Sequence, residues 1–192
     1  MKFDNPIGST PIDSDDLAGL IPKHIDTQEE LNAWESQNIL EAEPWAFKQQ
    51  NILNVDFIKE LHKKMFDHTW TWAGKFRHTD KNIGVDWKKI PVMLKDLCDD
   101  VQYWITNKTF SPDEIAVRFH HRLVYIHPFA NGNGRHARLM ADLLIVKLGG
   151  LRFSWGSGQD LTKSTPVRKQ YIEALQLADK GDYSKLLAFA RS

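Results

Sequence analysis

Apolar residues recur at every third or fourth position through long stretches of the chain, and prolines and glycines interrupt the recurrence. From Ile90 they follow at spacings of four, three, four and three residues, as Leu94, Leu97, Val101 and Trp104. After Pro112 the same period places on one face Ile115, Phe119, Leu123 and Ile126. One side of an α-helix repeats with this period, so both stretches predict amphipathic helices. We therefore expect an all-α fold.

Local start and stop signals delimit the other helices. Thr27 with Glu30 three positions later is a capping box, which predicts a helix over about 27–41 that ends before Pro44. Pro166 suits the first turn of a helix that Gly181 ends. Further helices are predicted over about 55–66, 134–148 and 183–190.

The first 26 residues differ from the rest of the chain. Prolines and glycines are frequent there, at positions 6, 8, 11, 19 and 22. These residues interrupt helices, so residues 1–26 are predicted to form an extended N-terminal arm. A length of 192 residues suits one domain, which we place at residues 27–192.

The stretch from Arg77 to Lys89 has no helical period. Asn82 and Gly84 lie near its centre, and both residue types favour tight turns. We predict one small β-hairpin here, as the single departure from the helical pattern.

Charge and cysteine content exclude several classes of function. Twenty-five basic residues balance 25 acidic ones, so no global field attracts DNA or an acidic membrane, and we expect no nucleic-acid partner. Cys98 is the single cysteine, which excludes an internal disulfide and a cysteine-rich zinc site. The N-terminus lacks the apolar core of a secretory signal, and the most apolar run is too short to span a bilayer. A soluble, cytoplasmic protein without a membrane partner is expected.

Residues 127–138 carry the chemistry and read His-Pro-Phe-Ala-Asn-Gly-Asn-Gly-Arg-His-Ala-Arg. Pro128 ends the preceding helix near His127, and glycines among asparagines allow a tight loop before the next helix. Free N–H groups and the dipole at a helix start attract anions. Arg135 and Arg138 project from that first turn, and arginine suits phosphate. His127 can act as a general base near neutral pH, so the segment predicts a phosphate cradle beside a base.

Each part of this segment also has a plainer interpretation. A Gly/Asn loop between helices is most often only a turn, and arginines early in a helix are usually solvated. However, positive side chains at a helix N-terminus are electrostatically unfavourable unless an anion binds there. That mismatch favours an anionic ligand.

The segment resembles the signature of the Fic (Fic/Doc) family, His-Pro-Phe-x-(Asp/Glu)-Gly-Asn-Gly-Arg-x-x-Arg. Every defined position matches except Asn131, where the family usually has an acid. Residues 61–77, LHKKMFDHTWTWAGKFR, are similar to a family helix and its Trp-Ala-Gly-x-x-Arg sequence, and residues 171–189 are similar to the C-terminal helices. The resemblance covers nearly all of residues 27–190, and within the family the chain most resembles the group labelled "mobile mystery protein B", associated with mobile elements. It implies a Fic-fold helical bundle with a small β-hairpin flap near the active site.

Fic proteins typically transfer AMP from ATP to a hydroxyl side chain of a target protein. The resemblance therefore implies a protein adenylyltransferase that uses ATP and Mg²⁺, with another protein or the chain itself as target and with a homo-oligomer as a compatible state. His127 would take the proton from the target Ser, Thr or Tyr. The residues that would hold the phosphates are Gly132, Asn133, Gly134, Arg135 and Arg138.

The acid that Asn131 replaces helps family members to hold Mg²⁺, which prefers carboxylate and phosphate oxygens. Asn131 offers a neutral carbonyl oxygen, which implies weaker metal binding. The departure leaves the rate, the metal and the transferred group open, because some family members transfer other phosphate-containing groups.

The resemblance assigns two further elements. A flap would align the backbone of the target beside it, and its residues would be Lys81, Asn82, Ile83, Gly84 and Val85. Many Fic proteins also carry an inhibitory helix, whose glutamate pairs with the second arginine of the signature. Its strict sequence pattern is absent. Glu35, in the helix over 27–41, is our candidate for this role by pairing with Arg138, and the plainer alternative is a solvated helical glutamate. Glu30 and Glu41 are competing candidates.

Two rival functions stay open. With Asn131 in place of the family acid, the protein could have lost its metal-binding site. It would then be a nucleotide- or partner-binding module without catalytic activity. Alternatively, a hydrolase could hold zinc through histidines, although no acid cluster in the sequence completes such a site. The histidines in question are His120, His121, His127 and His136.

Overall fold

The structure is a computed structural model that describes residues 8–156 and 161–192, and every regular element in these ranges is helical. The helices are α1 (Ser14–Leu17), α2 (Gln28–Ala46), α3 (Val55–Phe66), α4 (Ile90–Asn107), α5 (Pro112–Ile126), α6 (Asn133–Lys147), α7 (Pro166–Ala178) and α8 (Ser184–Arg191), with a short 3-10 helix, η1 (Trp87–Lys89), before α4. The all-α prediction is confirmed for these residues. No helix within them combines the length and hydropathy needed to cross a membrane.

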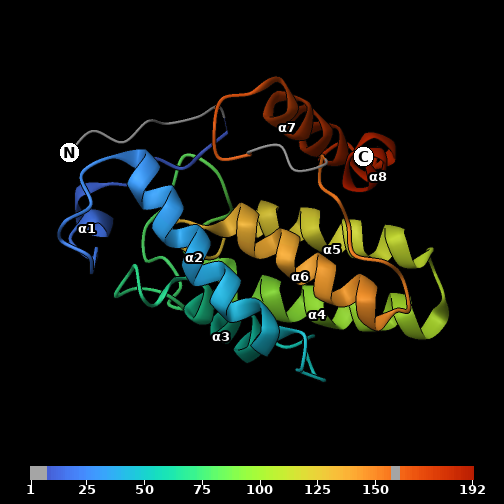
Figure 1. The fold of residues 1–192 in the computed structure, drawn as a ribbon. Helices are drawn as coiled ribbons and strands as arrows, with labels where there is room; N and C mark the ends of the chain where they lie inside the picture. The colour runs from blue at the N-terminus through green and yellow to red at the C-terminus, as the bar shows by residue number, and fades with distance from the viewer. Residues whose placement is uncertain (1–7, 157–160) are drawn as a thin grey trace.

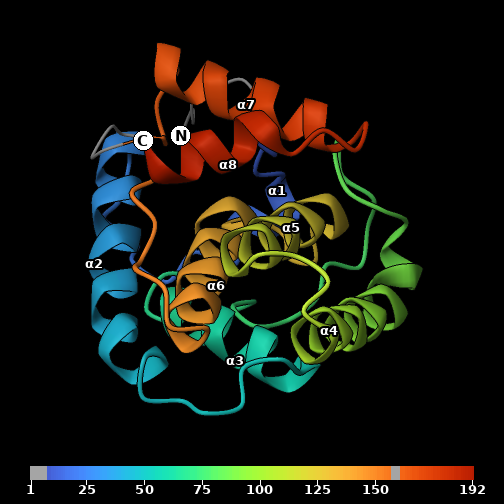
Figure 2. The ribbon, with the colours of Figure 1, turned by 90° about the vertical axis from the view of Figure 1, so that its right-hand side faces the viewer.

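Helices α5 and α6 lie side by side at the centre of the bundle. Figure 2 shows them surrounded by α2, α3, α4 and the α7–α8 pair. In Figure 1, α7 and α8 lie together on one side of this central pair, and α3 lies on the other. The loop over 127–132 joins the two central helices, so the most enclosed elements of the molecule hold both of its ends.

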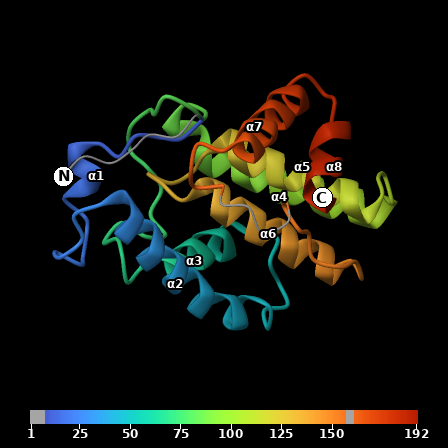
Figure 3. The same ribbon diagram turned by 45° about the horizontal axis from the view of Figure 1, so that its top comes forward.

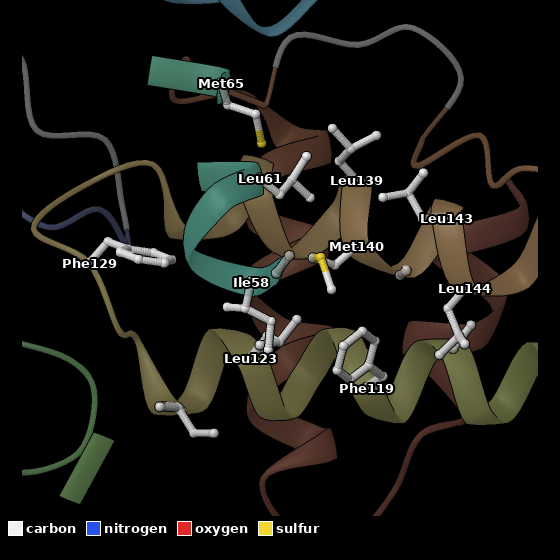
Figure 4. Close-up of a cluster of buried hydrophobic side chains, with 14 of the residues drawn as sticks. Ile58, Leu61, Met65, Phe119, Leu123, Phe129, Leu139, Met140, Leu143 and Leu144 are labelled. Carbon is white, nitrogen blue, oxygen red and sulfur yellow. The ribbon is translucent and has the colours of Figure 1, made fainter. Parts of the chain in front are cut away.

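The core fills the space between α3, α5 and α6. Figure 4 shows the side chains that meet there, among them Ile58, Leu61, Phe119, Leu123, Met140 and Leu143. Each is at most 1% exposed. Burying one such side chain stabilises a fold by roughly 1.5–3 kcal/mol, so the three helices form a rigid support for the loop. The apolar spacing after Pro112 therefore predicted the buried face of α5 correctly.

Helix α2 extends farther than predicted. Its capping box is present, with the Thr27 hydroxyl accepting from the Glu30 N–H and the Glu30 carboxylate accepting from the Thr27 N–H. The helix continues past Pro44, where we predicted it to have ended. A proline removes one helical hydrogen bond, here the bond to the Leu40 carbonyl. Leu40 is 61% exposed, so this turn faces water that can satisfy the carbonyl.

The described part of the N-terminal arm is not uniformly extended. Ser14–Leu17 form the single turn α1, and the Asp13 carboxylate caps it by accepting the N–H of Asp16. Leu20 is buried and forms an isolated antiparallel bridge with Trp70. The prediction of an extended segment is therefore wrong at α1, because acidic residues stabilise a helix start. The domain boundary at residue 27 stays a prediction.

The predicted β-hairpin is absent, since residues 77–89 contain no strand. Backbone groups in the middle of this loop bond to the end of α5 and to the Arg77 side chain rather than across a pair of strands. Val85 donates its N–H to the Ile126 carbonyl at 3.5 Å. The carbonyls of Thr79 and Val85 both accept from the guanidinium of Arg77. One guanidinium offers five donors in a fixed plane, and here it replaces the bonds that a hairpin would form across its strands.

Candidate active site

Side chains of the loop between α5 and α6 hold it in one shape. His127 ends α5 in the left-handed conformation, with a φ of 54°, and Pro128 prevents the helix from continuing. The Asn133 amide closes the loop, because its oxygen accepts the Phe129 N–H at 2.9 Å and its nitrogen donates to the Phe129 carbonyl at 2.8 Å. His127 and the start of α6 are thereby kept in a defined relation.

The start of α6 presents free N–H groups. No side chain caps this helix, and in the described residues the N–H groups of Asn133, Gly134 and Arg135 have no acceptor. Gly132 precedes them with a φ of 76°, and a Cβ there would lie 2.6 Å from the Phe66 ring. Free N–H groups at a helix N-terminus bind anions. The residues predicted to bind phosphate thus lie together at the start of α6. The Asn133 side chain closes the loop, while the Asn133 backbone N–H has no acceptor.

The two arginines on the first turn of α6 have different partners. Arg135 forms an ion pair with Glu35 of α2, with 2.8 Å between Nη1 and Oε2, and its guanidinium lies over the Phe66 ring. Arg138 lies over the Tyr171 ring of α7, 5.6 Å from its centroid. Within the described ranges, no carboxylate lies at ion-pair distance from Arg138. Arg138 is therefore available to an anion in this conformation, whereas Arg135 is already neutralised.

The Glu35 carboxylate has two partners. One oxygen accepts from Trp70 Nε1 at 2.7 Å, and the other pairs with Arg135. The side chain is only 3% exposed. We predicted Arg138 as the partner, and that prediction is wrong, because the guanidinium of Arg138 is held over Tyr171 instead.

The His127 side chain is buried, and both of its ring nitrogens have partners. Nδ1 lies 3.3 Å from the Val124 carbonyl oxygen, and Nε2 lies 2.8 Å from the Thr10 hydroxyl oxygen. A carbonyl oxygen can only accept, so we assign the proton of the neutral ring to Nδ1. Nε2 then accepts a hydrogen bond from the Thr10 hydroxyl. The ring is in the tautomer that a base needs in order to take a proton from a hydroxyl group.

Burial lowers the pKa of His127 to about 4, because the charged ring would lose its hydration. The bond to the Val124 carbonyl opposes this shift, and the nearby charges of Arg77 and Lys81 add to it. At neutral pH the imidazole is therefore unprotonated and able to accept a proton.

Two buried residues outside the segment position the loop, and we did not predict either of them. Arg77 donates from Nε to the His127 carbonyl at 2.7 Å. His62 accepts the Gly74 N–H at Nδ1, 3.0 Å away, and its Nε2 donates to the Asn131 carbonyl at 3.1 Å. The similarity of residues 61–77 to the family was the one signal that could have indicated them.

The loop predicted as a flap lies against the N-terminal arm. Lys81 Nζ contacts the Asp13 carboxylate at 2.5 Å and the Asp16 carboxylate at 2.6 Å. The Asn82 amide donates to the Ser9 carbonyl at 3.1 Å. Figure 3 shows the blue arm and this green loop together at the end of the bundle where α6 starts. The loop therefore contacts a peptide segment of the chain itself, and its role as a flap for a target stays a prediction.

The rest of the same loop approaches the base. Gly84 has a φ of 101°, and a Cβ there would lie 2.6 Å from the His127 Cβ. Ile83 lines the cavity in front of His127, and Val85 is bonded to the end of α5. Glycine at position 84 thus allows the loop to pass close to the histidine.

Asn131 is a poor metal ligand in this conformation. Its Oδ1 accepts the Gly132 N–H at 2.6 Å, and its Nδ2 donates to the Thr10 carbonyl at 3.3 Å. Across residues 8–156 and 161–192, no three His, Cys, Asp or Glu side chains are grouped as a metal site requires. Magnesium prefers several oxygen ligands, and one neutral, already bonded oxygen does not meet that need. The residues present do not fit a magnesium ion held by the protein alone.

The histidines considered for zinc have separate partners. His120 Nε2 lies 3.0 Å from the Tyr171 hydroxyl, His121 Nε2 lies 2.8 Å from an Asp179 oxygen, and His136 Nε2 lies 2.9 Å from the Ile58 carbonyl. Each ring is engaged in a different part of the bundle. The structure therefore offers no support for a hydrolase built on these histidines.

The cavity in front of His127 has a volume of about 150 Å³. Its walls come from the N-terminal arm, α2, the loop over 81–85, the 127–138 segment, residues 161–162 and α7. Pockets that bind small-molecule ligands and cofactors measure roughly 300–1,000 Å³. The cavity must therefore widen before it can hold a nucleoside triphosphate. The arm is the wall that lies directly against the base.

The buried histidines predict how stability depends on pH. Burial lowers the pKa of His127 and His136 to about 4 and that of His120 to about 3. In the unfolded chain these histidines become protonated near pH 6.5. In the folded protein the rings of His127 and His136 stay unprotonated until about pH 4. The free energy of unfolding should therefore fall as the pH drops from 7 to 5, by about 1–2 kcal/mol per histidine. Urea unfolding at a series of pH values measures this decrease.

The variant His136→Gln separates the histidine effect from that of the carboxylates. It removes one buried titrating ring, so its stability should depend less steeply on pH between 5 and 7. The exposed His78, changed to Gln, is the matched control and should keep the slope of the wild type. Equal slopes for both variants would contradict the assignment.

Comparison with known proteins relates this constellation to a family. Residues 52–145 match the model of the Fic/DOC family. Protein adenylyltransferase Fic from Nematostella vectensis is 30% identical over 150 residues, which cover 74% of this chain and 32% of that protein. Fic-1 (residues 134–508) from C. elegans superimposes with a TM-score of 0.63 at 24% identity, over 91% of this chain and 51% of that one. BepC from Bartonella tribocorum with bound AMPPNP superimposes with a TM-score of 0.64 at 18% identity, over 93% of this chain and 97% of that one.

These similarities differ in what they establish. The two structural matches show a shared Fic fold. The chain spans about a third of the length of the Nematostella relative, so that protein's activity is not transferred by similarity alone.

Proposed function

Residues 52–145 form a Fic/DOC family domain, and from that premise we propose that the chain is a protein adenylyltransferase that transfers AMP from ATP to a hydroxyl side chain. One observation carries the proposal. The neutral Nε2 of His127 lies 2.8 Å from a hydroxyl oxygen, beside the open N–H groups at the start of α6. Several relatives at 27–30% identity are named protein adenylyltransferases, which supports the same activity.

The proposed reaction uses His127 as the general base. Nε2 takes the proton of the acceptor hydroxyl, and the hydroxyl oxygen forms a bond to the α-phosphorus of ATP. The bond between that phosphorus and the oxygen leading to the β-phosphate breaks, and pyrophosphate leaves. Such a transfer depends mainly on positioning and on charge stabilisation, which a rigid loop and helix N-terminus provide.

The start of α6 is the proposed phosphate site. The N–H groups of Asn133 and Gly134 would donate to phosphate oxygens, and Arg138 would neutralise their charge. Arg135 would join them only after Glu35 has released it, because the two are now paired at 2.8 Å. Glu35 is therefore proposed as an inhibitory residue that acts through Arg135. A nucleotide analogue bound in the similar BepC structure supports a nucleotide in this fold.

The change Asn131→Asp tests how magnesium takes part. ATP would enter with its own magnesium, and a carboxylate next to the phosphates adds the ligand that this ion prefers. Asn131→Asp should tighten binding of magnesium–ATP by about tenfold, or ~1.4 kcal/mol. Calorimetric titration of ATP with and without magnesium measures the effect, and Asn131→Ser serves as a control without a charge. Equal affinities for Asn131→Asp and the wild type would show that residue 131 does not face the metal.

We propose membership of the "mobile mystery protein B" group, a target protein with an accessible hydroxyl, and a cytoplasmic location. A homo-oligomer is compatible with the fold.

The identity of the transferred group is tested by intact-mass spectrometry of the protein after incubation with ATP. A gain equal to AMP supports the proposal, and a gain equal to phosphate would replace it with phosphotransfer.

A further inference from the structure

The N-terminal arm lies in the active-site cleft as a bound peptide. Asn82 donates to the Ser9 carbonyl at 3.1 Å, and Asn131 donates to the Thr10 carbonyl at 3.3 Å. Every peptide has such carbonyl groups, so both amides form contacts that are independent of sequence. Gly8, Ser9 and Thr10 line the cavity in front of the base. The arm therefore occupies the place where an acceptor peptide would dock.

Thr10 presents a hydroxyl group to the base. Its Oγ1 lies 2.8 Å from His127 Nε2, and the residue is 8% exposed. A general base acts over heavy-atom distances of roughly 2.6–3.2 Å, so this hydroxyl is within reach of proton transfer. The hydroxyl of the neighbouring Ser9 is buried and has no hydrogen-bond partner in the described residues. The two adjacent hydroxyls thus differ, and only that of Thr10 contacts the base.

We propose that Thr10 is an acceptor of the AMP group and is modified by its own chain. This inference rests on the adenylyltransferase activity proposed above. Thr10 Oγ1 forms a bond to the α-phosphorus of ATP while the bond from that phosphorus to the bridging oxygen of the β-phosphate breaks. Pyrophosphate leaves with the electron pair of the broken bond. His127 Nε2 takes the proton from Thr10.

The product of this step changes the contacts of the arm. Once esterified, Oγ1 has no proton to donate, so the hydrogen bond to His127 Nε2 is lost. The modified arm therefore loses its one hydrogen bond to the base, which weakens its hold on the cleft.

The Glu35–Arg135 ion pair is expected to limit the rate at which Thr10 is modified. ATP must bind before Thr10 can react, and Arg135 is held by Glu35 until then. A variant that breaks this pair, Glu35→Gln, is the suitable background because it can keep the bond from Trp70. Modification of Thr10 should be faster in that background than in the wild type.

The test maps the modified residue on the full chain. Glu35→Gln protein is incubated with Mg²⁺ and α-labelled ATP, digested, and analysed by tandem mass spectrometry. We expect AMP on Thr10, at a rate per chain that stays constant over about a hundredfold dilution, since the arm is tethered beside its own base. In the Glu35→Gln background, the further change Thr10→Val should remove most of this label. Thr10→Ser in place of Thr10→Val should restore the label, and Ser9→Ala should leave it unchanged.

Each other outcome bears on a separate part of the inference. AMP on other residues or on an added protein, with Thr10 unmodified, would overturn the assignment of Thr10 and leave adenylyl transfer standing. A rate on Thr10 that rises in proportion to protein concentration would overturn the intramolecular step. No AMP on any protein, in any variant, would overturn the proposed activity together with the inference.

Discussion

Replacing His127 with alanine should lower the rate of AMP transfer by about a thousandfold, within the range that loss of a general base produces. The acceptor hydroxyl would then have no base at the position where His127 Nε2 now lies 2.8 Å from Thr10 Oγ1. Burial keeps the pKa of this ring near 4, so the wild-type base is unprotonated at neutral pH. Single-turnover transfer of label from α-labelled ATP measures the loss.

A second variant separates catalysis from folding. His127 has a φ of 54°, and asparagine tolerates that region better than alanine does. His127→Asn should therefore fold with less strain and still lose activity, because an amide cannot take up the proton. Thermal unfolding of both variants checks that the bundle is intact. A folded His127→Asn protein with nearly wild-type transfer would refute the role of the base.

Replacing Glu35 with glutamine should have the opposite effect and raise the rate of transfer, by about tenfold to a hundredfold, as expected when a coupling of 1–3 kcal/mol is removed. The amide oxygen can still accept from Trp70 Nε1, whereas the ion pair with Arg135 is lost. Arg135 is then free to bind phosphate. The same assay with α-labelled ATP measures the gain.

Stability should change in the other direction. Glu35 and Arg135 are largely buried, and removal of one partner leaves the other charge without compensation. Glu35→Gln should therefore unfold at a lower urea concentration, and ATP should stabilise it more than it stabilises the wild type. Glu41→Gln, at an exposed position of the same helix, is the matched control and should change neither property. Equal transfer rates for Glu35→Gln and the wild type would show that the ion pair does not restrain AMP transfer.

The fold could be predicted from the sequence wherever a local pattern determined it. The apolar period from Ile115 to Ile126 predicted the buried face of α5, and Pro128 predicted its end. The predicted end of α2 was wrong, because a proline close to a helix terminus costs a single bond that solvent can replace. The hairpin was wrong for another reason. Turn residues such as Asn82 and Gly84 indicate a bend, but they do not show where the flanking backbone groups find partners, and here Arg77 supplies them.

The candidate site was predictable in its composition and less so in its contacts. The 127–138 segment is local, so the proposed base and the proposed phosphate cradle follow from its residue types and spacing. Which arginine meets Glu35 depends on how α6 is rotated relative to α2 and α7, and the sequence contains no signal for that rotation. The contact between Thr10 and His127 joins residues separated by 117 positions. An arm containing α1 that returns to its own active site is a long-range event, which local propensities do not encode.

The proposed function requires that His127 directs AMP, rather than phosphate, onto a protein hydroxyl. The most direct measurement incubates the full chain as wild type, Glu35→Gln and His127→Asn with Mg²⁺ and ATP labelled at either the α or the γ position. Covalent label is then counted on the denatured protein. We expect label from the α position only, more of it in Glu35→Gln than in the wild type, and none above background in His127→Asn. Label from the γ position, or α label that persists without His127, would contradict the proposed function.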